Sequence, residues 1–180
     1  MFQQRPSQGW GPAAKLINPV YASTRFFQAL AQVRGYQKMP VYKAAQAVQH
    51  SADGSAYQQY QTLASQLTPA FTGAAPRGVW CWPGARTHAA ARLDPARRAV
   101  VRAFGPLAAR KAASGGDAPS LAVQVPQSSV GWAVAAWLVT HAGQFRLHEV
   151  SYAGFRWPAP TGHTGWVKDR GAAAGTVQAS

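Results

Sequence analysis

Acidic side chains are scarce in this sequence. Five of its 180 residues are Asp or Glu, against 18 Lys and Arg, which gives a net charge of +13 at neutral pH. Catalysis by paired carboxylates needs two such groups about 5 to 9.5 Å apart, and no two of the five are near neighbours along the chain. Asp94 directly precedes Pro95 at the start of a helical pattern, so a helix-capping role is favoured for it over a catalytic one.

Cysteine occurs once, at Cys81, which excludes an internal disulfide and a multi-cysteine metal cluster. The thiol is either buried, free, or half of a bridge to another molecule. The five histidines lie in separate segments, and the sequence contains no phosphate-binding Gly-Lys-Ser/Thr loop, so we expect neither a metal nor a cofactor. No run of eighteen apolar residues occurs, and residues 1–11 are polar, so the sequence predicts neither a membrane span nor an export signal.

Basic and aromatic residues are the abundant classes. A chain this basic attracts nucleic acid, anionic lipid or anionic wall polymer, and charge alone does not choose among them. The basic residues are spread from Arg5 to Arg170, which favours a generally basic surface over a dedicated nucleic-acid-binding arm. An apolar fraction of 47% with seven Trp predicts that the chain folds.

The first 70 residues have helical periodicity. Asn18-Pro19 offers an N-cap followed by proline at the first helical position of a helix that ends at Gly35. Further helices are predicted over about residues 40–49 and 55–67, with a turn at Asp53-Gly54 between them. We therefore expect a helical domain over residues 1–70.

Residues 71–91 are rich in Pro, Gly, Ala and Thr and are interpreted as a linker. Beyond them the sequence predicts a helix over 94–108, a strand over 121–125 and a helix capped by Ser128 or Ser129. A hairpin follows over 148–157, then a strand over 165–168 and a tail of small residues. The expected fold class is therefore α+β, with a small helix-strand-helix-strand-strand domain over residues 92–180.

The densest group of residues suited to ligand binding lies at the start of the chain. Amide side chains bind the hydroxyl and N-acetyl groups of sugars, and an aromatic ring packs on the apolar face of the pyranose. Gln3, Gln4, Gln8 and Trp10 supply these parts. The alternative is an ordered loop in which the amides satisfy backbone groups and Trp10 covers the edge of a core.

Met1-Phe2-Gln3-Gln4 resembles the Gly-Leu-Met-Gln-Ile type motif of lytic transglycosylases and related lysozyme-like enzymes. The run through Trp10-Gly11, with residues 18–23 and 44–49, is similar to actinobacterial wall-associated proteins of this type. The resemblance covers residues 1–70 and implies that Gln3 contacts substrate, while Gln46 lies where transglycosylases often have an asparagine. The expected substrate-binding residues are Gln3, Gln4, Arg5, Trp10 and Gln46.

In that family the catalytic glutamate precedes the glutamine motif, and Gln3 cannot supply the proton that a lysozyme-type cut requires. We therefore expect the chain as given to be a truncated lysozyme-like protein with no catalytic residue, inactive as a glycosidase. A reading frame that begins further upstream would supply the glutamate. It would also supply a signal or anchor that places the protein in the cell envelope or outside the cell.

Residues 120–180 resemble a small domain of wall hydrolases that is related to zinc D-Ala-D-Ala peptidases. The resemblance rests on Gly131-Trp132-Ala133, Val150-Ser151-Tyr152, Trp157 and residues 165–171. Those enzymes hold zinc with an Asp and two His, and the last six residues here contain neither. The resemblance therefore implies a binding or structural domain.

The sequence is compatible with two different functions. The first is a wall-associated protein that contacts peptidoglycan or another anionic wall polymer. The second is a basic nucleic-acid-binding protein, in which arginines contact phosphates and tryptophans stack on bases. Salt separates the two, because binding to nucleic acid weakens steeply as salt rises, whereas sugar contacts survive it.

Overall fold

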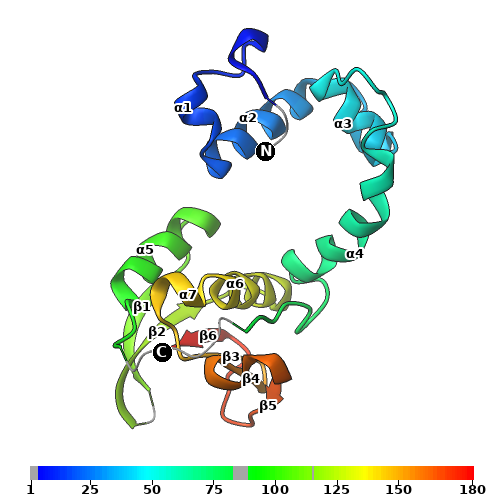
Figure 1. Ribbon diagram of the computed structural model, residues 1–180. Helices are drawn as coiled ribbons and strands as arrows, with labels where there is room; N and C mark the ends of the chain where they lie inside the picture. The colour runs from blue at the N-terminus through cyan, green and yellow to red at the C-terminus, as the bar shows by residue number, and fades with distance from the viewer. Residues whose placement is uncertain (1–3, 83–88, 115) are drawn as a thin grey trace. The chain divides into compact units, whose positions relative to one another are not determined.

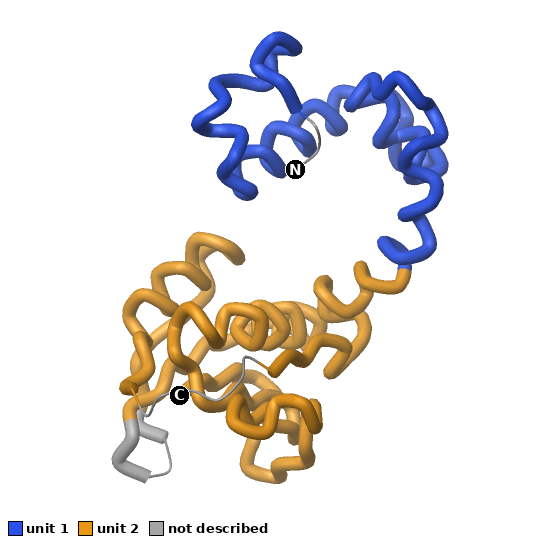
Figure 2. The backbone as a smooth tube through the Cα atoms, in the orientation of Figure 1, with its two compact units in different colours: residues 1–65 blue, residues 66–180 orange. Residues whose placement is uncertain are grey.

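The computed structural model describes residues 4–82, 89–114 and 116–180. The chain forms two compact units, Met1–Ser65 and Gln66–Ser180 (Figure 2). The first unit is helical and the second combines helices with a six-stranded antiparallel sheet (Figure 1). The expected α+β fold class is confirmed. Within the described ranges, no helix is both long enough and apolar enough to cross a membrane.

The first unit is built on helices α1 (Ala13–Leu16), α2 (Pro19–Gln32) and α3 (Val41–Gln49). Asn18 caps α2 as predicted, because its side-chain oxygen accepts hydrogen bonds from the N–H groups of Val20 and Tyr21 at 2.9 and 3.2 Å. The third predicted helix lies later than expected. Turns and a 3-10 segment occupy residues 53–60, and the helix α4 spans Gln61–Phe71, so it continues into the second unit.

The core of the first unit is small. Among residues 4–65, four apolar side chains are buried in it: Ala22, Phe26, Ala44 and Val48. Seven large apolar side chains of the same unit are exposed: Ile17, Val20, Phe27, Met39, Val41, Tyr60 and Leu63. Because burial of apolar surface is the main stabilising term in folding, we expect this unit to be only marginally stable.

Two adjacent phenylalanines test this description of the core. Phe26 is 9% exposed and Phe27 is 62% exposed. We expect Phe26→Ala to destabilise the unit by about 3 kcal/mol and Phe27→Ala to change its stability by about 0.5 kcal/mol or less. Urea unfolding followed by the NMR signal of the indole N–H of Trp10, the one tryptophan among residues 1–65, measures both. Equal losses from the two substitutions would show that α2 buries a different face.

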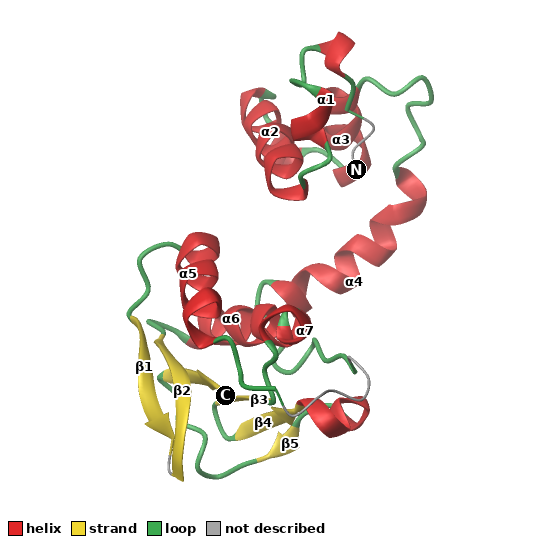
Figure 3. Ribbon diagram, turned by 60° about the vertical axis from the view of Figure 1, so that its left-hand side comes forward, coloured by secondary structure: helices red, strands yellow, loops and turns green. Residues whose placement is uncertain are grey.

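The second unit begins with the rest of α4 and continues into α5 (Leu93–Phe104). Strands β1 (Ala109–Ser114) and β2 (Gly116–Gln124) follow, then helices α6 (Ser128–Thr140) and α7 (Ala142–Phe145). The remaining strands are β3 (Glu149–Tyr152), β4 (Phe155–Pro158), β5 (Val167–Lys168) and β6 (Thr176–Ala179). The strand order is β1-β2-β6-β3-β4-β5, and α5, α6 and α7 lie on one side of the sheet (Figure 3).

Two of these strands differ from the sequence prediction. Residues 109–114 form the edge strand β1, although the sequence predicts no strand there. The predicted tail of small residues forms β6, which lies in the middle of the sheet between β2 and β3. The predicted serine cap of α6 is also wrong, because its N-cap is Gln127 and no side chain caps it. The predicted hairpin around Ala153-Gly154 is confirmed by the pairing of β3 with β4.

The described part of the predicted linker 71–91 belongs to the second unit and is bonded to its sheet and to α6. The indole N–H groups of Trp157 and Trp166 donate to the carbonyl oxygens of Cys81 and Val79, at 3.1 and 2.8 Å. The thiol of Cys81 donates to the carbonyl of Val139 at 3.2 Å and is half-buried. These bonds attach residues 79–81 to the sheet and to α6, and the division between the two compact units lies earlier, within α4.

Candidate functional site

Two adjoining cavities in the first unit share three lining residues, Gln8, Gln49 and His50. Their volumes are about 480 and 320 Å³. We call the two together the Gln49 groove. Gln8 comes from the segment that precedes α1, whereas Gln49 and His50 lie at the carboxyl end of α3. The groove therefore lies where the start of the chain meets the end of α3.

The larger cavity is mainly apolar. Trp10, Ala29, Val33, Ala47 and Val48 line it together with the shared residues. The backbone at Trp10 is attached to α2, because the hydroxyl of Tyr21 donates to its carbonyl oxygen at 3.3 Å. The next residue, Gly11, has φ +111° and lies against the Tyr21 hydroxyl, so a side chain at this position would collide with the ring. The glycine therefore permits the close contact that positions Trp10.

The smaller cavity is mainly polar. Arg5, Ser51 and Tyr57 line it with the shared residues. His50 has φ +49°, in the left-handed region, and its N–H donates to the carbonyl of Gln46 at 2.9 Å. This bond ends α3, and the chain turns there, so that residues 49–51 follow one another along the wall of the smaller cavity. Hydrogen-bond donors of three kinds, guanidinium, amide and phenol, are thereby placed around one cavity.

Gln49 is the residue that most clearly indicates a ligand. Its side chain is 8% exposed and lines both cavities. Its Nε2 atom is buried and has no hydrogen-bond partner among the described residues. A buried amide left unpaired costs about 1 to 3 kcal/mol, so a ligand that offers it a hydrogen-bond acceptor would recover this energy on binding.

Four of the five residues predicted to bind substrate are described, and Gln3 lies outside the described residues. Arg5 lines the smaller cavity and Trp10 the larger one. The amides of Gln4 and Gln46 donate to the carbonyls of Ala22 and Ser51, at 3.1 and 2.8 Å. The bond of Gln4 attaches the start of the chain to α2, and that of Gln46 attaches α3 to the loop that follows it. Neither residue lines the two cavities.

Sequence reasoning missed Gln49, His50 and Tyr57 as site residues. Gln49 ends an Ala-rich helical run, where an exposed amide is the ordinary expectation, and its burial arises only in the folded unit. The left-handed conformation of His50 has no signal in the sequence, since glycine or asparagine is the usual residue at such a position.

The acidic residues do not supply a proton donor to the groove. None of its lining residues is Asp or Glu. The nearest acid in sequence, Asp53, accepts hydrogen bonds from the N–H and hydroxyl of Ser55, and these bonds lower the pKa of its carboxyl group. A glycosidase acid needs the opposite shift, a raised pKa. The described lining therefore has the parts for binding and lacks those for acid catalysis.

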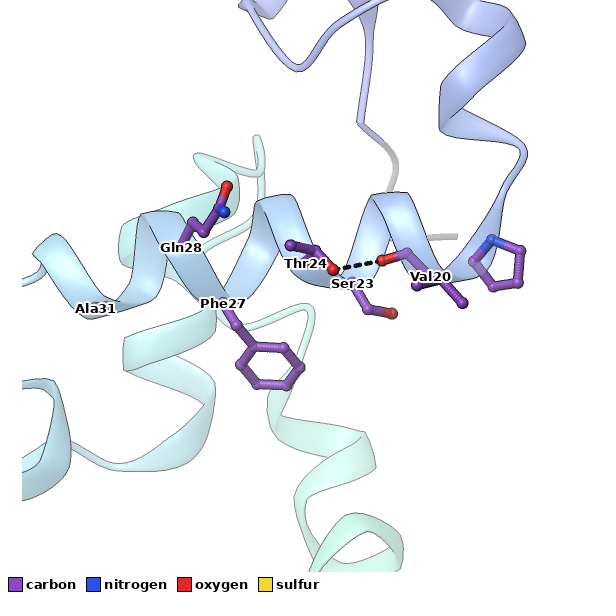
Figure 4. Close-up of a pocket in the computed structure, with 7 residues that line it drawn as sticks. Val20, Ser23, Thr24, Phe27, Gln28 and Ala31 are labelled. Carbon is purple, nitrogen blue, oxygen red and sulfur yellow. Dashed lines mark hydrogen bonds between the residues drawn. The ribbon is translucent and has the colours of Figure 1, made fainter. Parts of the chain in front are cut away.

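A third and larger cavity, of about 730 Å³, lies along the exposed face of α2 (Figure 4). Val20, Thr24 and Phe27 are among its lining residues, and the hydroxyl of Thr24 is bonded to the carbonyl of Val20 at 2.7 Å. No charged side chain lines this surface. Because specific ligand sites combine apolar surface with convergent polar groups, the Gln49 groove is the stronger candidate.

The tryptophan motifs of the second unit contribute to its core. Trp132 packs edge-to-face against Tyr152 and Trp166, with ring centroids 5.2 and 5.3 Å apart. The rings of His141 and His148 are each hydrogen-bonded to a backbone carbonyl, of Trp137 and Ala89 respectively. In the described ranges no group of three or more His, Cys, Asp or Glu side chains is placed to hold a metal ion.

Comparison with known protein families, with curated proteins and with solved structures found no match.

Proposed function

We propose that this chain is a cell-envelope protein of lysozyme-like type that binds the glycan of peptidoglycan in the Gln49 groove. The observation that carries the proposal is the buried, unpaired Nε2 of Gln49 in a cavity also lined by Trp10. Among biological ligands, N-acetylated amino sugars offer both a carbonyl acceptor and a flat apolar ring face. These two features match an unpaired amide donor and an adjacent indole.

In this proposal each end of the groove binds a different part of the glycan. The N-acetyl carbonyl of one sugar accepts a hydrogen bond from Gln49, and the pyranose ring packs against Trp10 in the apolar cavity. Arg5 and Tyr57 donate to the hydroxyl or carboxylate oxygens of the neighbouring unit in the polar cavity. The proposed role is binding, because the lining residues include no carboxylic acid to protonate the glycosidic oxygen.

Substitution of Gln49 by leucine separates this function from stability. Leucine has a similar size and removes the unpaired donor, so we expect Gln49→Leu to leave stability unchanged or to raise it. Binding to glycan should weaken by about tenfold, the equivalent of one lost hydrogen bond of about 1.4 kcal/mol. Trp10→Ala should weaken binding at least as much, through the lost ring contact. Both losses are measured by co-sedimentation with purified peptidoglycan from which anionic polymers have been removed.

The control is Trp82→Ala, which removes an indole that is 56% exposed in the second unit. It should leave co-sedimentation unchanged. Binding of the native chain should also persist in concentrated salt, because sugar contacts are not ionic. Binding that disappears with salt and does not depend on Gln49 would refute the proposal and favour the nucleic-acid alternative.

A further inference from the structure

A third of the basic residues lie in one short stretch of the second unit. Six of the 18 Lys and Arg residues fall between positions 92 and 111, on α5 and β1. Five of them flank α5 and are here called the α5 basic surface: Arg92, Arg97, Arg98, Arg102 and Lys111. All of these except the half-buried Arg97 are exposed. Clustering of this kind was not expected from the even spread of charge along the chain.

The fold explains how these side chains come together. Leu93, Ala96 and Val100 form the buried face of α5. Arg98 and Arg102 are four residues apart, so they lie one turn from each other on the face opposite to the core. Lys111 joins them from β1 because its ammonium group is bonded to Asp94, in the first turn of α5, at 2.6 Å.

Among the described residues, the five cations of this surface outnumber the acids beside them. Asp94 is its one acid and is already paired with Lys111. The other ion pair in the described residues joins Arg156 to Glu149. Asp94 also attracts Arg97 and Arg98, so a single carboxylate offsets part of the charge of five cations. Like charges one turn apart disfavour a helix, and cations near its first turn oppose its dipole. Arg102 lies in the last turn, where a cation is favoured, and Arg98 lies four residues after Asp94, so helix stability accounts for part of this arrangement and leaves the excess of positive charge unexplained.

We infer that the α5 basic surface binds a phosphodiester polymer of the cell wall. Three guanidinium groups on one helix, with a single carboxylate among them, suit a chain of repeated phosphates, because arginine pairs with phosphate by two parallel hydrogen bonds. The outward neighbours of the arginines, Pro95 and Ala103, offer no side-chain hydrogen bond for a nucleobase. The nearby ring of Phe104 is half-buried and packs edge-to-face on Trp137. The surface can thus contact phosphates, and none of Pro95, Ala103 and Phe104 offers a ring free to stack on a base.

The choice of a wall polymer over nucleic acid as the ligand rests on the proposed function. The location of the basic surface on α5 is independent of that function. The test uses the full chain with two probes, poly(glycerol phosphate) and a 20-base-pair DNA duplex, each titrated over a range of salt concentrations. The variant Arg98→Gln/Arg102→Gln should bind poly(glycerol phosphate) about tenfold more weakly. Its dependence on salt should also be shallower, because fewer counterions are released.

Two controls make the result specific. Arg34→Gln/Lys38→Gln removes the same charge from exposed positions of the first unit and should change affinity less than twofold. Asp94→Asn removes the one acid of the surface and should strengthen binding several-fold. Equal losses from both double variants would show that net charge alone attracts the polymer and would overturn the inference. Strong binding of the duplex through Arg98 and Arg102 with none of poly(glycerol phosphate) would overturn it in favour of nucleic acid.

The same variants distinguish this inference from the proposed function. Arg98→Gln/Arg102→Gln should leave binding to polymer-free peptidoglycan unchanged. Gln49→Leu should in turn leave binding to poly(glycerol phosphate) unchanged. If one of the two sites does not bind its proposed ligand, the test of the other site is therefore unaffected.

Discussion

Deletion of residues 176–180 is expected to unfold the second unit. These residues form β6 and the residue after it, and β6 pairs with β2 on one side and with β3 on the other. Val177 and Ala179 are buried in the core, and the carbonyl of Ser180 accepts from the N–H of His148 at 2.6 Å. The deletion divides the sheet into the hairpin β1-β2 and the three strands β3-β4-β5, which no longer pair with each other. The expected loss is about 5 kcal/mol or more, which is the whole stability of a typical small domain.

Circular dichroism and the dispersion of NMR amide signals measure this loss. A matched pair of substitutions locates its cause. Val177→Asp places a charge in the core and should be nearly as damaging as the deletion. Gln178→Asp, at the next position on the opposite face of the strand, should cost about 1 kcal/mol or less. A truncated chain that keeps its native spectrum would show that residues 176–180 do not join the sheet.

Replacement of Gly131 by alanine is expected to destabilise the second unit by about 3 kcal/mol or more. A side chain at Gly131 would overlap the ring of Tyr152, which is fully buried between α6 and the sheet. Intrinsic helix propensity acts in the other direction, because alanine is favoured over glycine by about 1 kcal/mol inside a helix. Packing should prevail, since the ring of Tyr152 is also held by its edge-to-face contact with Trp132.

Thermal unfolding of the Gly131→Ala and Gly175→Ala variants measures this effect. Gly175 has open space around its Cβ position and does not require a positive φ, so its substitution should be neutral. A stabilised Gly131→Ala variant would mean that α6 lies further from Tyr152 than the structure places it.

The helices with strong periodicity were predictable from the sequence. Helices α2 and α3 follow from the spacing of their apolar residues. The Asn18 cap follows from an asparagine side chain, which is well suited to accept hydrogen bonds from the free N–H groups of a helix. The β3–β4 hairpin follows from alternation on either side of Ala153-Gly154. In each case, residues near one another in sequence determine the element.

The strands β1 and β6 were not predictable in this way. Residues 109–114 consist of Ala, Arg, Lys and Ser, which favour helix or loop as much as strand. Val177 is the one large apolar residue of β6, and its place in the middle of the sheet depends on β2 and β3, which lie far away in the sequence. Tertiary pairing thus overrides weak local preference.

The candidate site was predictable in part, for a similar reason. The sequence points to Arg5 and Trp10 because charged, amide and aromatic residues gather at the start of the chain. It does not point to Gln49, because a glutamine at the end of an Ala-rich helix is ordinarily solvated. Gln49 becomes distinctive only in the fold, where its amide is buried and lines the same cavity as residues 8–10.

Binding of glycan at the Gln49 groove is tested most directly by NMR. The ¹⁵N-labelled protein is titrated with a soluble oligosaccharide of alternating N-acetylglucosamine and N-acetylmuramic acid. The side-chain amide of Gln49 and the indole N–H of Trp10 should shift together and saturate at one ligand concentration, while the indole N–H of Trp82 stays in place. If neither groove signal moves, or if the shifts are confined to the second unit, the groove does not bind glycan.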